Sequence, residues 1–470
     1  MGKKLTALML PLMGVLFITA YIRSSAVDVV YTDYIRLVNS YLENPYSLKP
    51  YLGADIFTRM PITWLQRMIN VRFFSYSTFF DMLLGACFLG VSVFIAARYA
   101  LKKNMEILEI ASIVFIGFSL NKWEMLLNGS GWVHFFAFAL FYYHYYLYDR
   151  YAAKEGKKKD GLRLSLLPWF TILLAAGPYS AVYAASVLPV YALRVFMIWK
   201  EGGREKGKKI KRELLLALNL LLPTLLYLLS RANSVEEHAG ATRLSIGEVI
   251  KADPFLLFRL LLKSLASAGL EPELLKKLGL SSAALMLLGL FMILLYLYAL
   301  WLNLGKGLYK KTLFPLFLLF SGMASHGLVS LSRWIFLNDS YAMSSRYALQ
   351  FQAGVIGILL SLYLDKRDCG ERGEKKRARP TPIALCIALF FTAGSFWVDA
   401  HEIHMSRYRK ENFMEKAEAA LDFERLSDEE LNRIFQYRHD AGRIRKALGI
   451  LSDRQLNIFA EEKKEALRAE

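Results

Sequence analysis

The chain is poor in cysteine and lacks the short motifs that mark several common enzyme classes. Only three cysteines occur among 470 residues, and none stands in a CxxC pair or at the Cys/His spacing of a zinc site. Disulfides and a structural metal are therefore not expected. There is no GxGxxG, P-loop, GxSxG or HExxH motif, so nothing indicates a bound nucleotide, a serine hydrolase or a zinc protease. His401 and His404 have no third ligand fixed by the sequence, and we expect neither a metal nor another cofactor.

Acidic residues are scarcer than basic ones. Asp and Glu number 41 against 59 Lys and Arg, which gives a formal net charge of +18. In a soluble protein, such a charge would suggest nucleic acid as a partner. Here 55% of the residues are hydrophobic, and the basic residues gather in short loops between long apolar runs. Orientation in a membrane explains this distribution better, so no nucleic-acid partner is expected.

Basic loops alternate with nearly uncharged turns, and this alternation predicts a topology. Cytoplasmic loops carry the excess of Lys and Arg, and one helix needs about 20 apolar residues to cross a bilayer. We therefore expect an all-α, multi-pass plasma-membrane protein with about eleven transmembrane helices, a cytoplasmic N-terminus and an extracytoplasmic C-terminus. The basic loops are 3–4, 98–103, 150–163, 194–212, 306–311 and 366–379.

The first apolar run is long for a signal peptide, and many spans follow it, so we expect an uncleaved helix there. The stretch 165–199 is too long for one span. It should bend at Gly177 and Pro178, because proline removes a backbone donor and glycine loosens the turn. The expected spans are 5–22, 76–97, 106–120, 129–149, two within 165–199, 213–230, 280–302, 312–330, 347–364 and 382–399.

Three longer segments are expected outside the membrane. Segments 23–75 and 231–279 belong to a transmembrane domain of residues 1–400, and residues 401–470 form a small extracytoplasmic helical domain. Within 231–279, the apolar run 254–263 contains two cations and suits an interfacial helix. In the last segment, Ser427 and Glu430 fit a capping box. Segment 23–75 should form short surface helices with Arg67 projecting away from an apolar stripe. That stripe comprises Phe57, Met60, Trp64, Met68 and Val71.

Polar residues that suit catalysis are concentrated just after the first span. A carboxylate there can act as general base on a sugar hydroxyl, because proton transfer needs an acceptor within hydrogen-bond reach. Asp33 is the first choice, since Thr32, Tyr34 and Arg36 make its surroundings polar. Asp28, which lies between two valines, is the second choice.

Arginines and aromatic residues near these carboxylates suit a sugar phosphate. Guanidinium groups bind phosphate by bidentate contacts, and aromatic rings stack on sugar faces. A second polar cluster lies between the spans 312–330 and 347–364, where Asp339 is expected to pair with Arg333 or Arg346. The residues expected to bind substrate are Arg346, Arg36, Arg59, Glu124 and Tyr34.

The layout resembles the GT-C superfamily of membrane glycosyltransferases. In that family, an acidic residue follows the first helix within a long first outside loop, and Asp28 and Asp33 stand at the corresponding place. The resemblance implies a sugar donor linked to polyprenyl phosphate or diphosphate, a glycan or lipid acceptor, and contact with membrane lipid. One departure is that the loop containing Glu124 has no Asp-x-Asp motif. This favours a metal-independent enzyme that uses a lipid monophosphate.

Two other functions fit the same number of spans. A polymerase or ligase of lipid-linked glycans would use arginines of a late outside segment, and Arg231, Arg243 and Arg259 are its candidates. A transporter would need ionisable residues within the spans or paired broken helices. The spans from 213 to 364 are almost free of charge, which disfavours the transporter.

The first testable consequence is the topology. Reporter fusions at Lys206 and at Glu470 should report opposite sides of the membrane, with Lys206 inside, because an odd number of spans separates the two termini. The same side for both fusions would contradict the topology.

Overall fold

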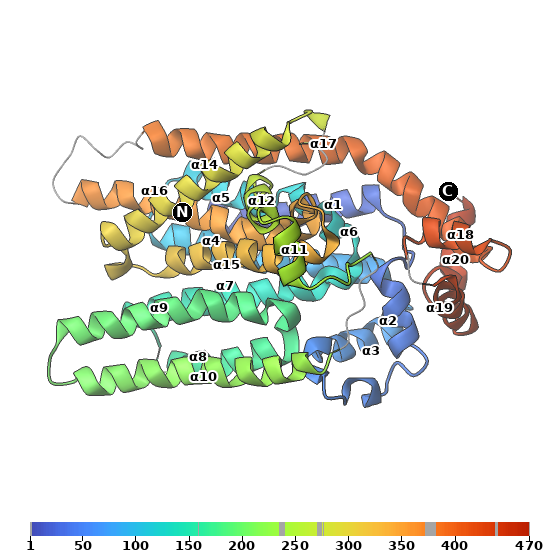
Figure 1. Ribbon diagram of the computed structural model, residues 1–470, viewed down its shortest axis with the longest axis horizontal. Helices are drawn as coiled ribbons and strands as arrows, with labels where there is room; N and C mark the ends of the chain where they lie inside the picture. Colours follow the sequence, from blue (N-terminus) through green and yellow to red (C-terminus); the bar gives the residue numbers. More distant parts are fainter. Residues whose placement is uncertain are drawn as a thin grey trace.

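The protein is a bundle of long helices with a group of short helices at one end, as Figure 1 shows. The computed structural model describes residues 2–157, 159–234, 240–269, 275, 277–371, 382–437 and 440–469. Every regular element within these ranges is helical, which confirms the all-α class. The helices of the first half are α1 (Gly2–Ser25), α2 (Asp33–Tyr41), α3 (Ile62–Phe74), α4 (Thr78–Lys102), α5 (Ile107–Gly117), α6 (Trp123–Leu127), α7 (Trp132–Ala152), α8 (Asp160–Phe170), α9 (Ser180–Glu201) and α10 (Lys206–Ala232).

The described residues of the second half add nine helices. They are α11 (Ile246–Ala252), α12 (Leu256–Ala266), α14 (Ser282–Leu300), α15 (Phe314–Arg333), α16 (Ala348–Glu371), α17 (Pro382–Leu421), α18 (Asp428–Ile434), α19 (Ala441–Asp453) and α20 (Glu461–Ala469). Single helical turns connect several of them, including Gly177–Tyr179, Tyr341–Met343 and Ser345–Tyr347.

Nine helical segments of the described chain are long and apolar enough to cross a membrane, against eleven expected spans. One segment, Asp160–Glu201, covers two expected spans, and it bends at Gly177–Tyr179, where Gly177 has a φ of 50°. The expected span 129–149 corresponds to α7, which is not among the nine. Its six tyrosines and two histidines lower its hydropathy, yet most of its side chains are buried inside the bundle. The chain is thus a multi-pass membrane protein.

The basic loops 98–103, 150–163, 194–212 and 306–311, as far as the structure describes them, lie together at one end of the bundle, which we call the basic end. Most of the loop 366–379 lies outside the described residues. Lys102 pairs with Glu155, and Arg194 donates to the carbonyl of Ala152 at 3.3 Å. The Thr312 hydroxyl donates to Asp149 at 2.7 Å, so the loop 306–311 adjoins that same end. The short helices α2, α3, α18, α19 and α20 lie at the other end in Figure 1. Short basic loops gathered at one end of a helical bundle are what the positive-inside pattern predicts.

Segment 23–75 forms short helices as expected, but α3 is turned differently. Arg67 is buried, with its guanidinium carbon 4.1 Å from the centroid of the Tyr41 ring, while Leu65, Ile69 and Phe73 are exposed. The expectation that Arg67 projects away was wrong. Stacking on aromatic rings stabilises the Arg67 guanidinium inside the protein. The helix is therefore turned so that several of its apolar side chains are exposed on the surface.

The C-terminal region is continuous with the membrane bundle. The helix α17 runs unbroken from Pro382 to Leu421, so the expected domain boundary at residue 400 falls inside it. Beyond it, the capping box of Ser427 and Glu430 begins α18 as expected. The backbone amide of Thr32 donates to the carbonyl of Phe435 at 3.0 Å. The last seventy residues therefore pack onto the segment that follows α1.

One buried carboxylate joins these distant segments. Asp28 accepts bonds from the Ser77 hydroxyl, from the backbone and hydroxyl of Thr78, and from the Asn457 amide, at 2.7–2.9 Å. Lys463 of α20 completes the set at 2.6 Å. An ionised carboxylate only accepts hydrogen bonds, at about four lone-pair sites, so these donors use its full capacity. The two ends of the chain meet at Asp28.

We expect Asp28→Asn to destabilise the protein strongly. The NH₂ group of the new asparagine is itself a donor and would face the groups that donate to Asp28. Some of these buried groups would lose their acceptor, which costs about 2–4 kcal/mol of folding free energy. Thermal unfolding in detergent measures the change. Asp422→Asn, which removes an exposed pair with Arg425, is the control and should change stability by less than about 0.5 kcal/mol. Equal unfolding midpoints for the two variants would contradict the role of Asp28.

Candidate functional site

A large cavity opens at the end of the bundle opposite the basic end. Its volume is about 1910 Å³, and α2, α6, α10, α15, α16, α18 and α19 contribute to its walls. Two carboxylates, Asp33 and Glu124, line it. The six arginines that line it are Arg36, Arg231, Arg333, Arg346, Arg433 and Arg443. Cationic groups that outnumber the acids make the cavity suited to an anionic ligand.

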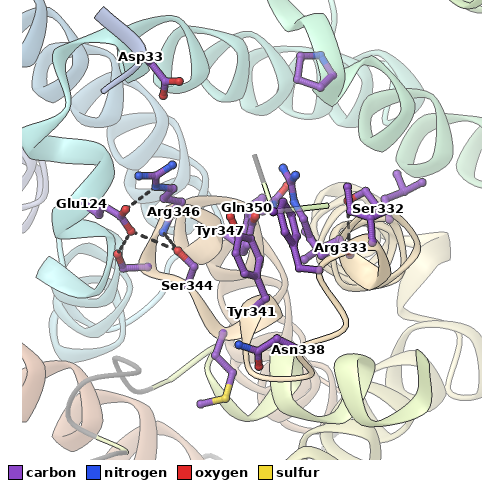
Figure 2. Close-up of a pocket in the computed structure, with 18 of the residues that line it drawn as sticks. Asp33, Glu124, Ser332, Arg333, Asn338, Tyr341, Ser344, Arg346, Tyr347 and Gln350 are labelled. Carbon is purple, nitrogen blue, oxygen red and sulfur yellow. Dashed lines mark hydrogen bonds and ion pairs between the residues drawn. The ribbon is translucent and has the colours of Figure 1, made fainter. Parts of the chain in front are cut away.

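Asp33 is the free carboxylate of this cavity. It is the first residue of α2, it is exposed, and within the described residues no hydrogen bond or ion pair holds it. Its position follows from its neighbours. Thr32 has a φ of 46°, which turns the chain sharply, and Tyr34 is buried and donates to Asp81 at 2.7 Å. Because Tyr34 anchors α2 on one side, Asp33 faces the cavity, as Figure 2 shows.

Glu124 and Arg346 form an ion pair on the facing wall. Arg346 donates through Nε to Glu124, which also accepts from the hydroxyls of Ser344 and Ser345 at 3.2 and 3.0 Å (Figure 2). The sequence did not predict this pairing, because 222 residues separate the partners. Three donors on one carboxylate hold Arg346 at the start of α16.

Tyr31 is a buried residue whose phenol is influenced by both groups. Burial raises the pKa of its phenol above the ordinary value, and the nearby carboxylates of Glu124 and Asp33 raise it further. The Arg346 guanidinium acts in the opposite direction. Asp33, Glu124 and Arg346 are therefore close enough to act on one phenol, which places the first-choice base and the expected phosphate-binding arginine in one electrostatic environment.

Asp339 holds the connection between α15 and α16, but its partners differ from those expected. It accepts from Arg259 at 2.9 Å and from Lys263 at 2.7 Å, and not from Arg333 or Arg346. Burial alone would raise the pKa of Asp339, but the bonds from Lys263 and Arg259 outweigh it and lower the pKa below the ordinary value. The expected interfacial helix, α12, thus positions the loop that leads to Arg346.

The other expected site residues lie outside the cavity lining, except Arg36. Asp28 is the buried junction described above, and Tyr34 is occupied by Asp81. Arg59 pairs with Asp55 at 2.9 Å and donates to the carbonyl of Pro50. Arg36 is exposed and lines the cavity. Of the two expected bases, only Asp33 has both access to the cavity and a free carboxylate.

Several lining residues were not expected to belong to a site. Arg433, Gln436 and Arg443 come from the C-terminal helices, whose composition is that of a solvated helical region. Tyr179 comes from the turn that breaks the 165–199 stretch, and Gln350 from α16. By contrast, Arg333 and its neighbours Ser332 and Trp334 belong to the polar cluster that the sequence shows between the spans 312–330 and 347–364.

The cavity also has an apolar wall. Its members come from the start of α14, the end of α15 and the turn after it, and they are Leu280, Leu285, Leu328, Leu331, Trp334, Ile335 and Phe336. Leu331 is 59% exposed on α15. A polar wall facing an apolar one suits an amphiphile with a charged head group.

No group of three or more His, Cys, Asp or Glu side chains that could hold a metal occurs among the residues that the structure describes. No family model matches the chain, and neither the curated proteins nor the solved structures contain a significant match. The chemistry of the cavity must therefore be argued from its own residues.

We expect Asp339→Asn to loosen the loop before Arg346. The amide no longer pairs with two cations, and hydrogen exchange of residues 338–346 should rise about tenfold or more, since a charged hydrogen bond contributes roughly 1.5–3 kcal/mol. The depressed pKa means that the clamp persists above the ordinary value and is lost only as the pH falls through the lower folded value. Asp365→Asn, whose partner Lys306 lies at the basic end, should leave this loop unchanged. Unaltered exchange in Asp339→Asn would contradict the clamp.

Proposed function

We propose that the protein transfers a sugar from a polyprenyl-phosphate-linked donor to a glycan or lipid acceptor on the outer face of the cell membrane. The observation that supports it best is the free Asp33 carboxylate in the same cavity as Arg346. Glycosyl transfer needs a base for the acceptor hydroxyl and positive charge for the leaving phosphate. The cavity offers both groups on facing walls.

In this proposal, Asp33 accepts the proton of the acceptor hydroxyl as the oxygen attacks the anomeric carbon. The bond from that carbon to the phosphate oxygen breaks, and the lipid phosphate leaves with the electron pair. Arg346 stabilises the developing negative charge, and Glu124 keeps its guanidinium oriented. The apolar wall receives the prenyl chain next to its phosphate. The resemblance to GT-C enzymes in layout points to the same reaction.

A polymerase or ligase of lipid-linked glycans is the second candidate. Arg231, which the sequence marked for that function, lines the cavity, whereas Arg259 is paired with Asp253 and Asp339. The leaving group and its charge are the same in both reactions. The two differ in whether one sugar or a whole chain is transferred, so the length of the product separates them.

The proposal predicts that Asp33→Asn abolishes transfer. Cells with the variant as their only copy should show the envelope glycan profile of a deletion strain by mass spectrometry, because loss of a general base costs roughly 10²–10⁴-fold in rate. Arg346→Lys should also reduce transfer, since lysine cannot make the bidentate contact with the phosphate. Membrane levels must match the wild type.

The control is Asp428→Asn. Like Asp33, Asp428 is the first residue of a short helix, so both substitutions remove a negative charge that interacts with a helix dipole. Unlike Asp33, Asp428 lies outside the cavity lining. Its glycan profile should equal the wild type. A wild-type profile in Asp33→Asn, or a deletion strain with unaltered glycans, would refute the proposed function.

A further inference from the structure

Three polar side chains that line the cavity have donors without a hydrogen-bond partner among the residues that the structure describes. Gln350 is 4% exposed and Tyr347 is 8% exposed, both line the cavity, and neither side chain makes a hydrogen bond within the described residues. The Nε of Arg333 is buried and likewise lacks a hydrogen-bond partner. Buried polar groups are nearly always satisfied, so the unpartnered Arg333 Nε, with the side chains of Tyr347 and Gln350 lining the cavity beside it, indicates a ligand.

The Arg333 cluster is distinct from the Glu124–Arg346 pair. The Arg333 guanidinium carbon lies 5.4 Å from the centroid of the Tyr347 ring, and Arg346 is the residue just before Tyr347. In Figure 2, Arg333 and Arg346 lie on either side of Tyr347. Glu124 compensates Arg346, whereas no carboxylate pairs with Arg333 in the part of the chain that the structure describes.

The chemistry of the cluster selects an anion. A guanidinium and a phenol hydroxyl both donate, and the Gln350 amide adds two more donors. An uncompensated arginine partly inside a protein is costly unless a negative group joins it. The neighbouring wall, with Leu328, Leu331 and Trp334, is apolar, so the anion belongs to an amphiphile.

We infer that Arg333, Tyr347 and Gln350 bind a second phosphoryl group, so that the carrier is a prenyl diphosphate. This inference rests on the proposed function and deepens it, because Arg346 takes the phosphoryl group next to the sugar and Arg333 the one next to the prenyl chain. The absence of an Asp-x-Asp motif favoured a monophosphate. Arg346 and Arg333, on either side of Tyr347, offer guanidinium donors to both phosphoryl groups, and Arg333 adds a positive charge that no carboxylate compensates among the described residues.

The test compares the binding of a prenyl monophosphate, the prenyl diphosphate of equal chain length and inorganic diphosphate to the full-length protein in detergent, by calorimetry. The wild type should bind the prenyl diphosphate roughly 10- to 100-fold more tightly than the monophosphate, as one added charged hydrogen bond provides. Arg333→Gln should remove this preference, and Arg333→Lys should restore part of it. Tyr347→Phe, which keeps the ring, should weaken it.

Arg407→Gln is the control, because Arg407 is 85% exposed, pairs with Glu411 and lies outside the cavity lining. Its preference should equal the wild type. Equal affinities of the wild type for the two prenyl ligands, or an unchanged preference in Arg333→Gln, would overturn the inference. Inorganic diphosphate that binds as tightly as the prenyl diphosphate would overturn the assignment to a lipid.

The binding result is independent of turnover. Asp33→Asn should keep the diphosphate preference, since Asp33 does not contact this cluster in the structure. If Asp33→Asn leaves the glycan profile unchanged while Arg333→Gln removes the preference, the transferase proposal fails and the diphosphate site stands. If Asp33→Asn abolishes transfer while Arg333→Gln keeps the preference, the diphosphate site fails and the transferase proposal stands.

Discussion

The Asp28 carboxylate is the interaction on which the arrangement of the cavity end depends. It lies just before α2 and accepts from the start of α4 and from the C-terminal segment with Asn457 and Lys463. α2 presents Asp33, and the C-terminal helices add Arg433 and Arg443 to the cavity walls. Residues far apart in a 470-residue chain can line one cavity because this buried carboxylate, together with bonds such as that from Thr32 to Phe435, joins the first outside segment to the C-terminal helices. Asp28 and Asp33 are near each other in the sequence but differ in their surroundings. Asp28 is buried and joins distant segments, whereas Asp33 is exposed and lines the cavity.

Charge within the cavity is distributed unevenly, and this gives it a direction. On one side, Glu124 satisfies Arg346 and hydroxyls orient both groups. On the other side, donors remain open next to apolar side chains. In the proposed function, a ligand with an acidic head and a hydrocarbon chain would place its head between the arginines and its chain along the apolar wall. The free carboxylate on the opposite wall then faces the end of the ligand that is farthest from the chain.

The sequence predicted the bundle well because its signals are local. Apolar run length, basic loops and the Gly177-Pro178 break act over a few residues, and the bends and helices followed them. Asp33 was also singled out by a local signal, its polar surroundings after the first span, and the structure places it in the cavity lining; its role as a base stays a prediction. Pairings such as Glu124 with Arg346, or Asp339 with Arg259, depend on tertiary packing and carry no local signal. For the same reason, the burial of Arg67 among aromatic rings and the C-terminal wall of the cavity were not foreseen.

The unbroken helix α17 links the bilayer to the cavity mechanically. Its part beyond residue 400, which ends at Leu421, is about 32 Å long at 1.5 Å per residue. A tilt of about 5° at that point would displace the far end by roughly 3 Å. The Arg409 guanidinium of α17 lies 3.2 Å from the centroid of the Trp123 ring, next to Glu124. A change in the tilt of α17, which bilayer thickness influences for a spanning helix, would therefore move Arg409 against Trp123, a residue of the cavity wall.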